Sequence, residues 1–181
     1  TYTAADQSGN TSTCSFTVTV SAAGVLTLLI DTVIVGCQGS DGVVAVNLFV
    51  DNWDDILGLQ FNVSWDETVL GFDTVGNDYP GLGLTSSEFN FTTAPNGQIS
   101  FFANDNNNNW PQLPDSSILF TMYFNLLNPT GTSSISYSGF IEAVNGSLNP
   151  VPVLTVGGFF SSSADNSPPT VTCPANILET T

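Results

Sequence analysis

Apolar and polar residues alternate along most of this chain in short runs that are separated by turn-forming residues. The clearest run lies at residues 57–65, where Leu, Leu, Phe, Val and Trp alternate with Gly, Gln, Asn and Ser. Because successive side chains of a strand point to opposite faces, this run predicts a β-strand with one buried face and one exposed face. Further strands are expected at residues 25–35, 43–50, 89–93, 98–103, 117–126, 133–137 and 152–160.

The turn-forming residues indicate how these strands are connected. Pro-Asn-Gly, an Asn-rich run and Asn-Pro-Thr-Gly lie between the apolar runs, and no stretch carries the period of an amphipathic helix. Many short strands without intervening helices are typical of sandwiches and jelly rolls. We therefore expect an all-β fold, an antiparallel jelly roll or β-sandwich. Its core is expected to contain Leu59, Phe61, Val63, Trp65, Phe120 and Phe124.

The distribution of the apolar runs predicts four segments. Residues 1–20 contain two short strands around a turn at residues 6–10, which predicts a hairpin. Residues 25–160 form one domain, residues 161–168 are a Ser-, Asp-, Asn- and Pro-rich linker, and residues 169–181 begin with one more strand. Because a lone hairpin and a lone strand cannot bury a core, we expect both termini to belong to further modules.

The charge of the chain narrows the classes of function. It has 16 acidic residues and no Lys, Arg or His, which gives a formal net charge of −16. Phosphate groups are bound chiefly by Lys and Arg, so we expect no nucleic acid and no anionic membrane as a partner. No apolar stretch approaches the roughly 20 residues that cross a bilayer, so membrane insertion is not expected either. Without a His or Lys base we expect no enzyme, although carboxylates alone can hydrolyse glycosides.

The central segment contains two motifs that resemble a known family. The stretch VVAVNLFVDNWDDILGLQFNVSWDETVLGF, and LPDSSILFTMYFNLL further along, are similar to cohesin-like domains of large secreted bacterial proteins. The resemblance implies a nine-stranded jelly-roll sandwich for residues 25–160. Cohesins of cellulosomes bind dockerins, but a fold alone does not transfer that function.

The two ends resemble opposite ends of another module, the immunoglobulin-like hyalin repeat. TYTAADQSGNTSTCSFTVTV matches its closing hairpin, and PPTVTCPANI matches its opening strand. The resemblance implies partial immunoglobulin-like strands at both termini. It also implies that Cys14 and Cys173 form disulfides, each within its own module, and Cys37 is then the odd cysteine.

Two groups of residues near turns are candidate binding positions. Asp51, Asp54 and Asp55 could offer oxygen ligands to calcium, but they do not match a calcium-loop motif, and solvated turns are the favoured interpretation. No other metal site and no cofactor is expected. Trp53 and Trp110 lie near turns and could form a platform for a sugar, whereas Trp65 continues an apolar face and is expected in the core.

Short motifs mark candidate glycosylation positions. Asn-x-Ser/Thr sequons occur at Asn10, Asn62, Asn90 and Asn145. Thr32 and Thr74 follow Asp and precede an apolar residue, as in the O-glycosylation motif of bacteria that carry such cohesin-like domains. Asn62 is the best placed sequon, since it faces away from the apolar side of its strand.

These features lead to one expected function and one alternative. We expect a structural unit of an extracellular bacterial fibre or surface adhesin, assembled head-to-tail with copies of itself or neighbouring repeats through its terminal strands. The alternative is a protein- or carbohydrate-binding module of a secreted multidomain protein. A cell-surface or extracellular location is common to both.

Overall fold

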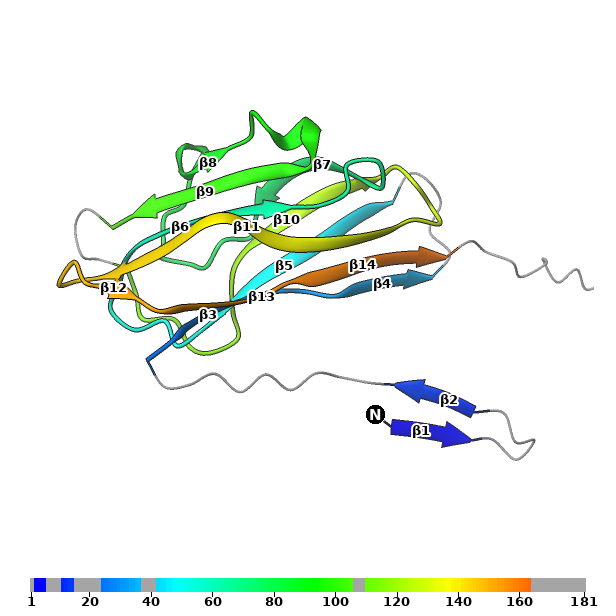
Figure 1. Cartoon of the computed structure of the whole chain (residues 1–181), viewed down its shortest axis with the longest axis horizontal. Helices are drawn as coiled ribbons and strands as arrows, with labels where there is room; N and C mark the ends of the chain where they lie inside the picture. The colour runs from blue at the N-terminus through cyan, green and yellow to red at the C-terminus, as the bar shows by residue number, and fades with distance from the viewer. Residues whose placement is uncertain (1, 6–10, 15–23, 37–41, 106–109, 164–181) are drawn as a thin grey trace, which may run out of the picture.

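The structure is a computed structural model that describes residues 2–5, 11–14, 24–36, 42–105 and 110–163 (Figure 1). Its regular elements are β-strands, apart from two three-residue 3₁₀ turns, η1 (Ser86–Glu88) and η2 (Ala94–Asn96). No helix in the described segments is long and apolar enough to cross a membrane. The all-β prediction is confirmed.

The first sheet of the sandwich has five strands in the order β13-β3-β5-β10-β7. Their bounds are Val153–Val156, Leu26–Ile30, Val43–Asp51, Ser117–Leu126 and Leu70–Gly76. β5 pairs antiparallel with both β3 and β10, and β10 pairs antiparallel with β7. β7 therefore forms one edge of this sheet.

The second sheet runs in the order β4-β14-β11-β6-β9-β8, and β12 pairs with the far end of β11. The bounds are Val33–Gly36, Gly158–Ser163, Thr132–Asn145, Ile56–Ser64, Gln98–Asn104, Phe89–Asn90 and, for β12, Pro150–Val151. The long strand β11 is central to this sheet, and its outward side is open to solvent.

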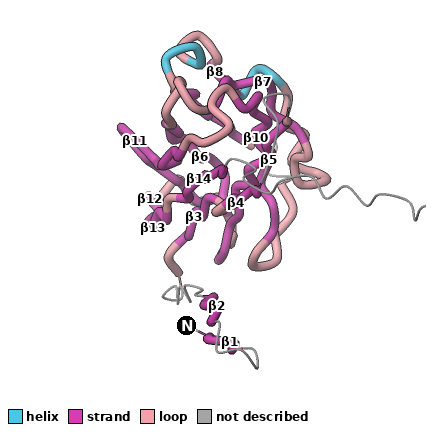
Figure 2. Tube along the Cα trace, turned by 90° about the vertical axis from the view of Figure 1, so that its right-hand side faces the viewer, coloured by secondary structure: helices cyan, strands magenta, loops and turns pink. Residues whose placement is uncertain are grey.

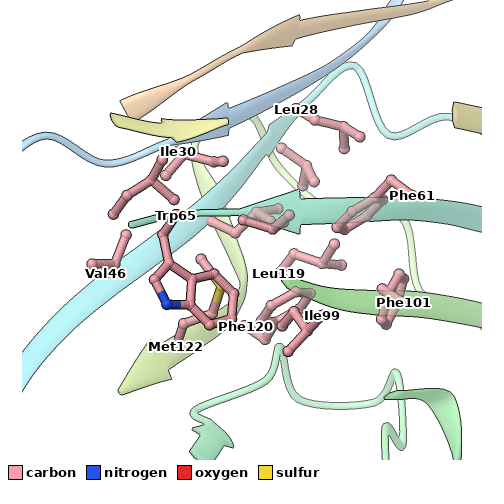
Figure 3. Packing of buried hydrophobic residues seen from close by; sticks show 14 of the residues in the cluster. Leu28, Ile30, Val46, Phe61, Trp65, Ile99, Phe101, Leu119, Phe120 and Met122 are labelled. Carbon is pink, nitrogen blue, oxygen red and sulfur yellow. The ribbon is translucent and has the colours of Figure 1, made fainter. Parts of the chain in front are cut away.

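The core lies between the two sheets, and Figure 3 shows part of it. All six residues that the alternation predicts, Leu59, Phe61, Val63, Trp65, Phe120 and Phe124, are buried. Aromatic rings account for much of the contact: Phe61 lies with ring centroids 5.0 Å from Phe101 and 6.3 Å from Phe120. The Trp65 indole donates a hydrogen bond of 2.9 Å to the carbonyl of Leu70, so this buried polar group is satisfied.

The expected strand at 25–35 is wrong as a single element. The chain leaves the first sheet after β3 and enters the second sheet as β4, and β13 and β14 make the same change of sheet. Because both pairs change sheet side by side in the same direction, β13–β3 and β14–β4 are parallel, whereas the other pairs are antiparallel. Gly158 permits the crossing, since a Cβ there would overlap the backbone oxygen of Asp31.

The ends of the chain are described only in part. β1 (Tyr2–Ala5) and β2 (Thr11–Cys14) pair antiparallel as a separate two-stranded sheet, whereas the turn expected at residues 6–10 lies outside the described residues. β14 continues through Ser163, into the stretch expected to be a linker. Residues 164–181, which include the expected final strand, lie outside the described residues.

Candidate functional site

The outward sides of β6, β9 and β11 form the candidate site, called here the binding face. Along each strand the inward residues are buried and the next residues are open, so Gln60 and Asn62 of β6 alternate with Leu59, Phe61 and Val63. Three large apolar side chains are nevertheless exposed on this side: Phe102 (62%), Phe140 (67%) and Leu148 (72%). Such side chains normally lie inside, so their grouping on one face suggests an interaction surface.

A small hollow lies at one end of the binding face. It has a volume of about 180 Å³ and is walled by Phe102, Val144 and Leu148, with Gly58 in its lining. A Cβ on Gly58 would lie 3.0 Å from a methyl group of Val144, so a larger residue at this position would crowd the side chain of Val144 and fill part of the hollow. The hollow is large enough for one apolar side chain of a partner.

A bulge in β11 places Phe140 on the surface. Ser138 is opposite Asn62 and Glu142 is opposite Gln60, so three residues of β11 oppose the single residue between them on β6. Gly139 has φ +69°, and a Cβ there would lie 2.8 Å from the Asn62 amide nitrogen. The bulge therefore depends on glycine and turns an aromatic residue toward solvent. Bulges of this kind are frequent beside binding sites.

Polar side chains hold the rest of the face in place. Gln60 donates a hydrogen bond of 3.1 Å to the carboxylate of Glu142. Gln98 donates to the hydroxyls of Ser64 and Ser138 at 3.3 and 3.2 Å, and these hydroxyls are 2.7 Å apart. The face thus combines apolar groups and one carboxylate on a hydrogen-bonded sheet.

The two candidate tryptophans, Trp53 and Trp110, lie next to each other outside the binding face. Trp53 is only 2% exposed, its ring centroid is 5.7 Å from that of Trp110, and it forms a β-bridge with Leu113. The Trp110 indole donates to the carbonyl of Leu82 at 3.1 Å. Trp53 therefore belongs to the core, which the sequence analysis did not expect, and little of its ring surface is open to a sugar.

The three aspartates considered for calcium accept hydrogen bonds from two other segments, the loop before β10 and the turn after β11. Asp51 accepts a hydrogen bond of 2.7 Å from the Ser116 amide. Asp54 accepts one of 3.3 Å from the Gln112 side chain, and Asp55 accepts one of 3.2 Å from the Gly146 amide. Among the described residues no group of three His, Cys, Asp or Glu side chains could hold a metal ion. These aspartates fasten loops to one another.

The candidate modification positions are spread over the surface. Thr32 and Thr74 are exposed, and Asn62 lies half-buried on the binding face. Asn90 is exposed and its side-chain oxygen accepts from the Thr92 amide at 3.0 Å, whereas that of Asn145 accepts from two amides of its own turn. Asn10, Cys37 and Cys173 lie outside the described residues, and of Cys14 only the backbone is described. Glycosylation and both disulfides stay predictions.

Two carboxylates have shifted acidities, and both shifts oppose a role as general acid. Hydrogen bonds from the Thr68 hydroxyl and amide lower the pKa of Asp66. Burial alone would raise the pKa of Glu88, but hydrogen bonds from Thr85 and Ser87 lower it overall. A glycosidase acid needs a raised pKa, so neither residue suits the carboxylate-only hydrolase.

The exposed aromatic residues were missed by the sequence analysis. Phe102 follows Phe101 in one strand, and adjacent strand residues point to opposite faces, so one of the two must face outward. That signal was present in the sequence. The position of Phe140 carried no such signal, because it depends on the bulge.

Comparison with known proteins identifies solved structures that have a similar fold. No protein-family model and no curated protein sequence matches the chain. A solved structure of the Coh-OlpA–Doc918 cohesin–dockerin complex of Clostridium thermocellum matches with a TM-score of 0.66 and 14% identity, over 76% of this chain and 99% of that chain. The sixth cohesin of scaffoldin B from Acetivibrio cellulolyticus, in complex with a Cel5 dockerin mutant, matches with a TM-score of 0.63 and 17% identity, over 77% and 99%.

An archaeal cohesin has the same shape. The non-cellulosomal cohesin of Archaeoglobus fulgidus matches with a TM-score of 0.61 and 20% identity, over 78% of this chain and 94% of that chain. At these identities the likeness concerns the fold. The chain contains a β-sandwich with the jelly-roll fold of cohesin domains.

Proposed function

We propose that the chain is a protein-binding module of a secreted multidomain protein and that it binds its partner through the binding face. The observation that carries this proposal is the grouping of Phe102, Phe140 and Leu148 on the outward side of one sheet, beside a hollow of about 180 Å³. Buried aromatic anchors that fill such hollows supply much of the affinity of protein interfaces.

The solved neighbours support the same class of function. The cohesins of Clostridium thermocellum and Acetivibrio cellulolyticus were solved with dockerins bound to them. The shared fold makes a protein partner the natural candidate here, and a dockerin-like protein is the first to test. The exposed apolar groups of the binding face give this chain its own reason to bind one.

The charge of the chain indicates what the partner carries. Two copies would each bring a net charge of −16 and no cationic side chain, so they repel one another. A partner with Lys or Arg can instead pair with Glu142 while an apolar side chain enters the hollow. The proposed partner is therefore a different protein with a basic contact surface.

The experiment isolates the partner and then tests the face. The purified chain is immobilised, secreted proteins of the source organism are passed over it, and each captured protein is purified for titration calorimetry. Phe102→Ser and Phe140→Ser should each weaken binding at least about tenfold, which is about 1.4 kcal/mol. Ile34→Ser is the matched control, because Ile34 is 76% exposed but lies on β4 at the edge of the sheet. Equal affinities for all four proteins would refute the proposal.

The head-to-tail fibre is a second candidate, favoured by one observation. β1 and β2 form a two-stranded sheet of their own, and such a sheet is marginal in water unless further strands join it. Strands of a neighbouring unit could supply them. Light scattering of the native material decides this: filaments or long oligomers would support the fibre despite the repulsion between equally charged units, and a compact monomer at all concentrations contradicts it.

A further inference from the structure

A second interaction surface runs along β7, which belongs to the other sheet of the sandwich from the strands of the binding face. β7 pairs with β10 on one side only, so the other side of its backbone is a free edge. Segment 84–97, which contains η1, β8 and η2, lies across from this edge and lines the same hollows as β7; Figure 2 shows β8 and the two short helical turns, in cyan, beside β7. Within the described chain no hydrogen bond joins that segment to residues 71–76. The backbone groups of the edge remain available to another strand.

Two hollows follow the whole length of this free edge. The first, of about 560 Å³, is lined by every residue from Leu70 to Thr74 and, across from them, by Phe91, Ala94 and Pro95. The second, of about 180 Å³, is lined by 74–76 and by residues 84–86. Because consecutive strand residues line both hollows, the hollows lie beside the edge and not on one face of the sheet. Thr74 and Phe91 line both, so the two hollows are neighbours along the edge, and together they are called here the β7 groove.

The groove is apolar inside and acidic along its length. Phe72 and Phe91 stack with ring centroids 5.4 Å apart, and Leu127 is 55% exposed at one end. Glu67 and Asp73 line the first hollow, and Asp78 lines the second. No Lys, Arg or His exists in the chain to neutralise these carboxylates.

Asp73 occupies a special position in the strand. Thr74 pairs with Tyr123 and Phe72 pairs with Phe124, so Asp73 is an extra residue without a partner in β10. A charge in an edge-strand bulge hinders pairing with another copy of the same acidic chain. It does not hinder a strand that carries Lys or Arg.

We propose that the β7 groove binds an extended segment of a partner protein that alternates apolar residues with Lys or Arg. The segment adds to β7 as a sixth strand of the five-stranded sheet, its apolar side chains enter the hollows, and its cations pair with Glu67, Asp73 and Asp78. This surface is independent of the binding face, and either can fail without the other.

The probe is a synthetic heptapeptide that alternates Val and Lys, and the matched peptide alternates Val and Glu. In a buffer of low ionic strength the Val–Lys peptide should bind the whole chain, and the Val–Glu peptide should not. Hydrogen exchange should slow at the amides of residues 71–75 when the Val–Lys peptide is bound. Asp73→Asn should weaken binding about threefold, since an exposed ion pair contributes modestly. Asp54→Asn removes the same charge at an exposed position outside both surfaces, keeps the oxygen that accepts from Gln112, and should leave the affinity unchanged.

Three results would overturn the proposal. A Val–Lys peptide with every backbone nitrogen methylated cannot donate to β7, so its binding with equal affinity would indicate unspecific attraction to an acidic protein. Slowed exchange at other strands, with residues 71–75 unchanged, would place the peptide elsewhere. Dimerisation of Asp73→Asn together with no peptide binding by the wild-type chain would mean that Asp73 only guards the edge.

Discussion

Replacing Tyr137 by phenylalanine should stabilise the sandwich, because the change removes a buried hydroxyl group and keeps the aromatic ring. The Tyr137 hydroxyl is shielded from solvent and has no hydrogen-bond partner among the described residues. Its ring contacts Phe61 edge-on with centroids 5.3 Å apart, and phenylalanine keeps that contact. A buried hydroxyl without a partner costs about 1–3 kcal/mol, so we expect a gain of about 1 kcal/mol in the free energy of unfolding.

The pH dependence of the folding stability gives a second, independent test of the Tyr137 argument. Burial raises the pKa of Tyr137 well above its ordinary value of 10. Below that pH both the folded and the unfolded chain keep the phenolic proton, so stability is fully present. Above it the unfolded chain releases the proton while the folded chain retains it, and stability falls by about 1.4 kcal/mol per pH unit. Tyr137→Phe lacks this loss, so its advantage should widen above pH 10.

Urea denaturation at pH 7 and at pH 10–11 measures both the gain in stability and its increase at high pH. Tyr123→Phe is the control, since Tyr123 is a half-buried residue of β10 whose hydroxyl is not among the buried groups without a partner. It should change stability by less than about 0.5 kcal/mol. A Tyr137→Phe variant that is less stable than wild type at pH 7 would show that the hydroxyl does have a partner, and the reasoning would be wrong.

Three further changes test other parts of the structure. Thr27→Val should also raise the free energy of unfolding by about 1 kcal/mol in the same urea assay, because the Thr27 hydroxyl is buried and has no hydrogen-bond partner among the described residues; a loss of stability would contradict this. Gly158→Ala should lower the free energy of unfolding by about 3 kcal/mol in thermal denaturation, because the added Cβ would lie closer than 3.0 Å to backbone atoms. Gly76→Ala is the control and should be tolerated, because its added Cβ would meet only a side chain at 3.5 Å. Thr68→Val should raise the pKa of Asp66 toward its ordinary value, as NMR titration would show, since the 2.6 Å bond that helps to lower it is lost; in the wild type that contribution to stability is lost as pH falls through the lowered pKa.

The sequence predicted the parts of the fold that depend on local alternation. Leu59, Phe61 and Val63 face the core because a half-buried strand must alternate, and this requirement holds whatever the strand pairs with. The strand at 25–35 was wrong because its apolar run continues through the change of sheet, and only the other strand pair at that corner reveals the crossing. Periodicity reports the face of a residue but not the sheet to which it belongs.

The candidate site was harder to predict for a related reason. Phe140 is exposed because three residues of β11 oppose one residue of β6, and this count is a property of the pairing between distant strands. Likewise, the β7 groove exists because segment 84–97 passes beside an edge without bonding to it. Both features arise from tertiary arrangement, so a pattern read along one strand does not contain them.

The charge of the chain links the two proposed surfaces. The chain has 16 acidic residues and no cationic side chain, so the described sandwich is held by apolar burial and backbone pairing and not by ion pairs between side chains. The half-buried carboxylate of Glu142 on the binding face and the exposed carboxylate of Asp73 on the β7 groove therefore discourage self-association and favour a partner that brings Lys or Arg. It follows that binding at either surface should weaken with rising salt, because the attraction between opposite charges at exposed positions is screened.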